Sequence, residues 1–118
     1  GIFMATIIYG IPTCDSVRKA RQWLNAQDIE HTFVDVREST PSKALIDEWL
    51  ARLGAEKLVN KRSTTWKNMS DIERHEAQSG DTAAVLIANP TLIKRPVLSH
   101  GSVLDVGFKA DTYRVYFQ

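Results

Sequence analysis

The first third of the chain consists of a short apolar run, an amphipathic segment and a second apolar run. Residues 5–9 are rich in β-branched side chains and end at Gly10, which predicts a buried strand. From Asp15 to about residues 25–28, apolar positions recur at helical spacing and predict an amphipathic helix. Residues 30–36 predict a second strand. A strand, a helix and a strand in this order form a βαβ unit, so we expect parallel strands with a right-handed crossover.

The middle of the chain has the apolar spacing and the capping residues of several short helices. Ser70 followed by Glu73 fits a capping box, in which the two side chains satisfy backbone N–H groups of the first turn. The predicted segments are a helix between Ser42 and Gly54, one more turn within 56–60, a loop or short turn at 60–66, a helix from the N-cap Ser70 to about Gln78, and a helix from Asp81 to Ala88.

The last third returns to strand-like patterns. Residues 97–99 and 102–106 predict a hairpin that turns at His100–Gly101, and residues 111–117 predict a terminal helix. The complete order is βαβ, then helices, then ββα. This order predicts an α/β, thioredoxin-like fold with a four-stranded mixed sheet and a helical insertion at about residues 41–88.

Composition narrows the class of protein. A chain of 118 residues is expected to form one domain. Fifteen basic and fourteen acidic residues leave a net charge of +1, so we expect no direct nucleic-acid partner and no membrane partner. The three histidines are scattered, and one cysteine provides neither an internal disulfide nor a cysteine-rich zinc site. We therefore expect a cytoplasmic monomer with no bound metal or cofactor.

The single cysteine, Cys14, follows the first predicted strand and stands at the start of the first predicted helix. Backbone N–H groups at a helix N-terminus lack intrahelical partners, and the helix dipole is positive there, so both favour thiolate over thiol. In α/β folds this end of the strands commonly carries the site. The alternative is that Cys14 is a small buried hydrophobe without reactivity.

Two arginines and a proline are candidates for the surroundings of Cys14. Arg95 and Pro96 precede the third predicted strand, which in a thioredoxin-like sheet lies beside the start of the first helix. Arg62, in an irregular segment, is predicted to close over the same point. A guanidinium stabilises a thiolate and binds carboxylates or oxyanions at two points, and Thr13 is predicted to contribute to this anion site. The alternatives are solvated surface arginines and a trans bond before Pro96, although cis bonds are accessible to X-Pro.

A dithiol mechanism within the chain is excluded by the sequence. The residue three positions after Cys14 is Val17, and the chain has no other cysteine. A mixed disulfide on Cys14 must therefore be resolved by an outside thiol, most simply glutathione. We expect glutathione to act as a co-substrate.

Four segments of the sequence resemble the ArsC-like family of thioredoxin-fold proteins, which includes arsenate reductases, the Spx regulators and the YffB branch. The segments are YGIPTCD at residues 9–15, RKA at 18–20, NKRSTTW at 60–66 and LIKRPVL at 92–98. The first and the third are most similar to the YffB branch.

The resemblance begins at Met4, which we interpret as the natural start, with residues 1–3 as a remnant of cloning. It implies a single ArsC-type domain over residues 4–118 with the helical insertion noted above. It also implies a cis bond before Pro96 and a nucleophilic Cys14 that forms a mixed disulfide with glutathione. The anion-binding arginines of the family correspond to Arg62 and Arg95.

Two departures from the family pattern bear on the reaction. Arsenate reductases have a third arginine after the last hairpin, where residues 106–109 of this chain offer only Lys109. Spx regulators generally use a Cys-x-x-Cys switch, which Val17 removes. We therefore predict a glutathione-dependent monothiol thiol–disulfide oxidoreductase that acts on an unidentified disulfide or oxyanion. The alternatives are an arsenate reductase and an Spx-like regulator that binds a protein partner through Arg18, Lys19 and Arg21.

Overall fold

The computed structural model describes residues 5–118, so residues 1–3 and Met4, interpreted above as the natural start, lie outside the described residues. The chain forms two compact units. The sheet unit comprises the described residues 5–35 and 95–118, and the helical unit comprises residues 36–94. Along the sequence, the helical unit is therefore one continuous insertion between the two segments that form the sheet unit.

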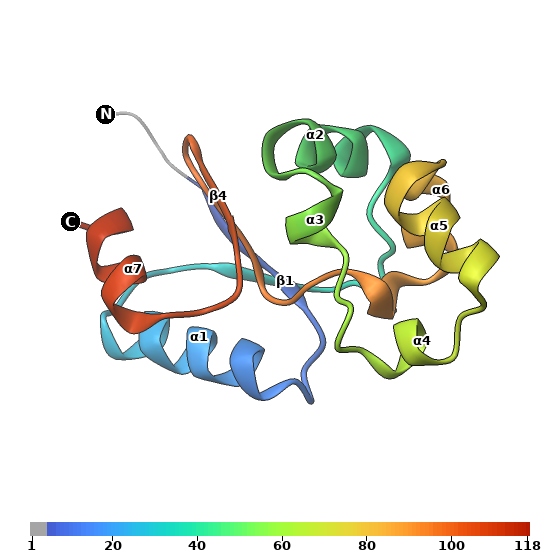
Figure 1. Ribbon diagram of the computed structural model, residues 1–118. Coiled ribbons are helices and arrows are strands. Elements are labelled where there is room, and N and C mark those ends of the chain that lie inside the picture. The colour runs from blue at the N-terminus through green and yellow to red at the C-terminus, as the bar shows by residue number, and fades with distance from the viewer. Residues whose placement is uncertain (1–4) are drawn as a thin grey trace. The chain divides into compact units, whose positions relative to one another are not determined.

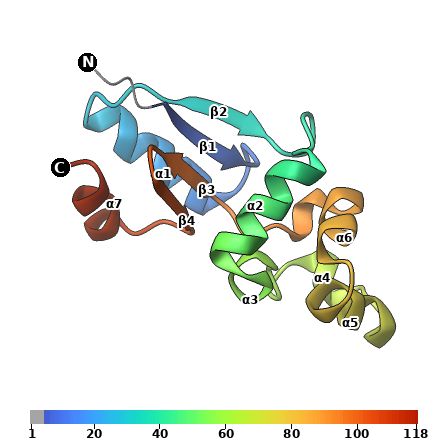
Figure 2. The ribbon, with the colours of Figure 1, turned by 90° about the horizontal axis from the view of Figure 1, so that it is seen from above.

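The sheet unit is built on four strands in the order β2-β1-β3-β4 (Figures 1 and 2). The strands are β1 (Thr6–Gly10), β2 (Thr32–Asp35), β3 (Val97–His100) and β4 (Val103–Val106). β1 pairs with β2 in parallel and with β3 antiparallel, and β3 pairs with β4 antiparallel. The predicted α/β class, the four-stranded mixed sheet and the parallel βαβ unit are confirmed.

The β3–β4 hairpin turns one residue later than predicted. His100 is the last residue of β3, where it pairs with Thr6 of β1 and with Val103 of β4. A hydrogen bond of 2.7 Å joins His100 Nδ1 to Thr6 Oγ1. The turn residues are Gly101 and Ser102, and Gly101 has a φ of 56°, in the left-handed region that favours glycine. The prediction of a turn at His100–Gly101 was wrong because pairing with β1 holds the histidine in the sheet.

Two helices, α1 (Asp15–Ala26) and α7 (Ala110–Tyr116), pack against one face of this sheet. Ile8 and Leu98 are cross-strand partners on β1 and β3, so their side chains lie on the same face. The buried residues of the shared core are Ile8, Val17, Ala20, Leu24, Leu98 and Tyr113. Trp23 of α1 meets Tyr113 of α7 edge to face, with 5.8 Å between the ring centroids, and this contact joins the two helices.

Two polar side chains beside this core, Tyr116 and His100, interact with neighbouring groups. The Tyr116 hydroxyl donates a hydrogen bond of 2.6 Å to Asp105 Oδ2, and this bond raises the pKa of Tyr116 to about 12. Burial lowers the pKa of His100 below its ordinary value of 6.5. The imidazole also lies against the ring of Phe117, with 4.3 Å between the centroids. The C-terminal segment is thus tied to β3 by a ring contact and to β4 by a hydrogen bond to a carboxylate.

The helical unit contains five α-helices and a short 3₁₀-helix. They are α2 (Lys43–Leu53), α3 (Ala55–Leu58), α4 (Thr64–Lys67), α5 (Asp71–Ser79), α6 (Thr82–Ala88) and η1 (Pro90–Leu92). The segment 60–66, predicted as a loop or short turn, contains the start of α4. The Ser63 hydroxyl begins this turn of helix by accepting a hydrogen bond of 3.1 Å from the Trp66 N–H. No helix within residues 5–118 combines the length and the apolarity needed to cross a membrane.

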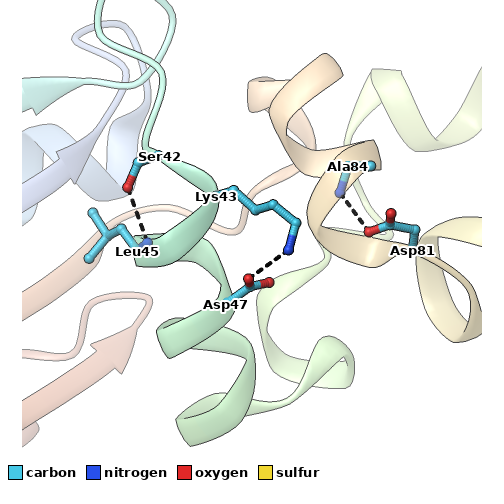
Figure 3. A network of polar contacts seen from close by, with 6 residues as sticks. All are labelled: Ser42, Lys43, Leu45, Asp47, Asp81 and Ala84. Atoms are coloured by element: carbon cyan, nitrogen blue, oxygen red, sulfur yellow. Dashed lines mark hydrogen bonds and ion pairs between the residues drawn. The ribbon is translucent and has the colours of Figure 1, made fainter.

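Side-chain caps mark the starts of four of the five α-helices of this unit, namely α2, α4, α5 and α6. Ser42 Oγ accepts from the Leu45 N–H at 3.2 Å, and Asp81 Oδ1 accepts from the Ala84 N–H at 3.1 Å (Figure 3). Ser70 forms the predicted capping box, with both reciprocal hydrogen bonds present. The helix starts at Asp81 and Ser70 are therefore confirmed, because local side-chain chemistry specifies them.

Candidate functional site

Cys14 is the N-cap residue of α1, as the sequence predicts. Its N–H donates to the Ile11 carbonyl at 3.1 Å, and its carbonyl accepts from the Arg18 N–H at 3.0 Å. Its side chain makes no capping hydrogen bond. Cys14 is a partly buried residue that packs against the core of the sheet unit. The backbone therefore holds Cys14 at the positive end of α1, where the residue is partly exposed.

The close approach of α1 to the end of β1 depends on Gly10. A Cβ atom built on this glycine would lie 2.5 Å from Cγ2 and 3.2 Å from Cγ1 of Val17. Carbon atoms normally approach to about 3.5–4.0 Å, so only glycine fits here without a shift of the helix. Val17 belongs to the first turn of α1 and is fully buried. The contact between Gly10 and Val17 therefore sets how closely the first turn of α1, which begins at Cys14, lies to the end of β1.

Pro96 leads directly into β3 and is buried. The bond between Arg95 and Pro96 is cis, which confirms the prediction from the sequence. The Pro96 carbonyl accepts a hydrogen bond of 2.9 Å from the Gly107 N–H, which follows β4. The backbone at Pro96 is therefore held by the neighbouring strand segment.

The register of β1 and β3 brings this segment to the same end of the sheet as the cysteine. The first residue of β3 pairs with the fourth residue of β1. The β1–β3 pairing ends at Tyr9 and Val97, so Gly10 and Ile11 continue the chain at the same end of the sheet where Arg95 and Pro96 lead into β3. Ile11 is the residue whose carbonyl binds the Cys14 N–H. Arg95 is half-buried. Its predicted approach to Cys14 stays a prediction.

Thr13 lies in the turn between β1 and α1 and is exposed. The turn is closed by the hydrogen bond from Cys14 to Ile11, so Thr13 stands directly before the N-cap. Its predicted role in an anion site is compatible with this position, and that role stays a prediction.

Arg62 belongs to the helical unit, where it is exposed in the turn between α3 and α4. Its N–H donates to Asn60 Oδ1 at 3.0 Å, and the Asn60 N–H donates to the Leu92 carbonyl at 2.8 Å. The turn that carries Arg62 is thus anchored to the end of the same unit. The predicted approach of Arg62 to Cys14 stays a prediction.

Two contacts made by side chains of α1 were not predicted from the sequence. Asp15 and Arg18 form an ion pair one turn into α1, and the Arg21 guanidinium lies over the ring of Phe33, 4.2 Å from its centroid. The i,i+3 spacing of Asp15 and Arg18 is a signal that the sequence does contain. The contact with Phe33 has no local signal, because it joins α1 to β2.

Lys109 and His100 lie in the last third of the chain. Lys109, the cation in the stretch after the last hairpin, is exposed and is the N-cap residue of α7. The His100 ring is engaged with Thr6, as described above. Within residues 5–118, no group of three or more histidine, cysteine, aspartate or glutamate side chains is arranged to hold a metal ion.

Comparison with known proteins finds relatives along nearly the whole chain. The sequence model of the ArsC family matches residues 9–116. An uncharacterised protein of Haemophilus influenzae is 36% identical over 110 residues, which cover 93% of this chain and 96% of that protein. The global transcriptional regulator Spx of Streptococcus mutans is 30% identical over 110 residues, covering 89% and 77% of the two chains.

Comparison with solved structures also finds relatives that cover nearly the whole chain. A YffB protein superimposes with a TM-score of 0.88 at 30% identity, covering 94% of this chain and 97% of that chain. An arsenate reductase (ArsC) related protein from Brucella melitensis has a TM-score of 0.75 at 33% identity and covers 100% and 98%. The thioredoxin-like α/β fold predicted from the order of elements is confirmed. By sequence and by structure, the chain belongs to the ArsC family.

Proposed function

We propose that this protein is a glutathione-dependent monothiol thiol–disulfide oxidoreductase of the reducing cytoplasm, with Cys14 as its nucleophile. The observation that carries the proposal is the position of the only cysteine in the sequence, at the N-cap of a twelve-residue helix with part of its surface open. The N-terminus of such a helix stabilises negative charge on sulfur. With no second cysteine, every catalytic cycle needs an external thiol.

The chemistry proceeds through two thiol–disulfide exchanges. The Cys14 thiolate attacks the glutathione sulfur of a glutathionylated substrate, the substrate thiolate leaves and takes up a proton, and a Cys14–glutathione disulfide forms. A second glutathione thiolate then attacks the glutathione sulfur of this mixed disulfide. Oxidised glutathione is released and the Cys14 thiolate returns. The net reaction reduces one substrate disulfide and joins two glutathione molecules, so electrons and protons balance.

The neighbouring residues have distinct roles in this proposal. The N–H groups of the first turn of α1 and the guanidinium of Arg95 stabilise the thiolate, and Arg95 and Arg62 bind the carboxylates of glutathione. Thr13 adds a hydroxyl to the same anion site. Pro96 shapes the groove that accepts the glutathione backbone beside the sulfur.

The test combines turnover with a trap for the intermediate. We expect wild-type protein to reduce a glutathionylated peptide with glutathione, and mass spectrometry of the quenched protein to find one glutathione on Cys14. Cys14→Ser should abolish both signals. Arg95→Ala and Arg62→Ala should lower kcat/KM about 10- to 100-fold, because each removes a charge-assisted hydrogen bond.

Arg114→Gln is the matched control, since Arg114 is an exposed arginine of α7, paired with Asp111 and outside the proposed site. It should retain wild-type turnover. Wild-type protein that neither turns over the peptide nor carries glutathione on Cys14 would refute the proposed activity. Iodoacetamide alkylation of Cys14 no faster than that of free glutathione at neutral pH would remove its physical basis.

A second candidate function is binding of a protein partner, favoured by the 30% identity to the regulator Spx. Retention of a stoichiometric partner by both wild type and Cys14→Ser would support it, whereas loss of all function in Cys14→Ser would count against it. Arsenate reduction, suggested by the arsenate reductase related structure, is a third candidate. Coupled turnover of arsenate with glutathione and glutaredoxin decides it.

A further inference from the structure

The surface of α1 carries an open depression that the proposed chemistry does not use. It is lined by Arg18, Arg21, Gln22 and Asn25, which are two guanidinium and two carboxamide side chains. These side chains project from one face of the helix, at positions separated by three or four residues. The lining offers many N–H donors from two guanidinium groups, of which Arg18 is also paired with Asp15, and such a set of donors fits a carboxylate.

Arg21 is held in place for such a role. Its guanidinium carbon lies 4.2 Å from the ring centroid of Phe33 on β2, so the plane of the group is supported by an aromatic ring. Its Nε is buried and has no hydrogen-bond partner within residues 5–118. An arginine ordered in this way loses little conformational entropy when it binds a ligand. Arg18, one turn earlier, is oriented by its ion pair with Asp15.

The depression lies on the helix face that begins at the cysteine. Arg18, Arg21 and Asn25 stand four, seven and eleven residues after Cys14, which is the spacing of one face of an α-helix. With a rise of about 1.5 Å per residue, Arg18 lies about 6 Å and Arg21 about 10 Å along the axis from Cys14. A ligand that reaches the sulfur along this face therefore meets both arginines.

The form of the depression favours a protein as the ligand. Sites for small molecules are concave and enclose most of the ligand, whereas this depression is open to solvent on the outside of a helix. An extended peptide spans about 10 Å in three residues. An acidic side chain three residues from a substrate cysteine thus reaches Arg21 while the cysteine lies at Cys14.

We propose that the α1 depression recognises an aspartate or glutamate side chain of the substrate protein, three residues from the cysteine whose mixed disulfide with glutathione Cys14 reduces. The proposal rests on the proposed function and adds the substrate class, namely glutathionylated proteins with an acidic flank. Arg18 and Arg21 bind the carboxylate, and Gln22 and Asn25 donate further hydrogen bonds.

The test compares two glutathionylated peptides that differ only in glutamate or glutamine three residues from the cysteine. We expect wild-type kcat/KM to be about five- to tenfold higher for the glutamate peptide, which corresponds to one charge-assisted contact at a solvent-exposed site. Arg21→Gln and Arg18→Gln should each remove most of this preference while turnover of the glutamine peptide is retained. High salt should also reduce it, because the pair is accessible to ions.

Arg114→Gln is again the matched control, because Arg114 pairs with Asp111 at the same i,i+3 spacing as Arg18 with Asp15. It should keep the full preference for the glutamate peptide. If Arg21→Gln fails to fold because it loses its contact with Phe33, Arg18→Gln decides the question alone, since Arg18 is more than half exposed.

A binding measurement separates this inference from the proposed function. Cysteine-free glutamate and glutamine peptides are titrated into wild-type protein, and NMR shifts of the amides of residues 18–25 are followed. Specific shifts with the glutamate peptide support the acidic subsite. Turnover of both peptides at equal rates, without such shifts, overturns the subsite and leaves the oxidoreductase intact. Shifts without any turnover overturn the oxidoreductase and, with it, the assignment of the ligand as a substrate.

Discussion

Substitution of Gly10 by alanine tests whether the contact between β1 and α1 positions the cysteine. The added methyl group would lie 2.5 Å from Val17 Cγ2, about 1 Å closer than carbon atoms normally approach. Val17 is fully buried, so its side chain has no open space into which to turn. Overpacking of this kind costs about 1–3 kcal/mol, and the lower entropy of the unfolded alanine chain returns about 0.4–1 kcal/mol. We therefore expect Gly10→Ala to lower the free energy of unfolding by about 1–2 kcal/mol.

The control is a double-mutant cycle with Val17→Ala, which removes both of the clashing methyl groups. Val17→Ala alone should cost about 2 kcal/mol, because it deletes two buried methyl groups and leaves a small cavity. In that background, Gly10→Ala should cost nothing or stabilise slightly. The four free energies of unfolding come from urea titrations analysed by linear extrapolation.

The cycle has a clear refuting result. If the two costs add to within about 0.5 kcal/mol, Gly10 and Val17 do not interact as described. A second readout follows the cysteine itself. Gly10→Ala should change the rate of Cys14 alkylation, because the first turn of α1 has to move, and Gly10→Ala with Val17→Ala should restore it. An unchanged rate in Gly10→Ala would show that this contact does not position the thiol.

Three further predictions concern stability. Tyr116→Phe should lower the free energy of unfolding by about 1–2 kcal/mol at neutral pH, because it removes a hydrogen bond to a carboxylate. The pKa of Tyr116 is about 12 in the folded state and 10.0 in the unfolded state, so this stabilisation is complete below pH 10 and is lost as the pH rises from 10 to 12. Urea titrations at a series of pH values measure it. Burial lowers the pKa of His100 in the folded state, so the unfolded chain binds a proton first and stability should fall as pH decreases below 6.5; a thermal-unfolding profile of His100→Gln that falls as steeply as wild type would contradict this. Ser70→Ala should cost about 1 kcal/mol by removing the N-cap of α5, measured by urea unfolding, and Ser70→Asp should recover most of it.

The accuracy of the sequence predictions follows the range of the interactions that decide each feature. The helix starts at Ser70 and Asp81 were predicted because a side chain and a backbone N–H three residues later specify them. The turn at His100–Gly101 was misplaced because a bond to Thr6, 94 residues earlier in the chain, holds His100 in β3. The segment 60–66 was predicted only as a loop or short turn, because the single helical turn of α4 has too few positions to show a period.

The features of the candidate site also divide into those set by nearby residues in the sequence and those set by contacts between separate elements. Cys14 was predicted as the N-cap of α1 because a strand, a turn and an amphipathic helix follow one another in sequence. The cis bond before Pro96 was predicted through the family resemblance, and the structure contains it. The support of Arg21 by Phe33 was not predicted, because it depends on how α1 lies over β2.

The sequence by itself determined the order of elements, the helix caps, the parallel βαβ unit and the absence of a second cysteine. These features depend on residue spacing, on hydrogen bonds between residues close in sequence and on the number of cysteines. All three can be read directly from the sequence. Only the tertiary structure decided the β1–β3 register, the fit of Gly10 against Val17, and the open arginine face that follows Cys14. These features depend on close packing between separate elements, and the periodicity of a single element carries no information about its neighbours in space.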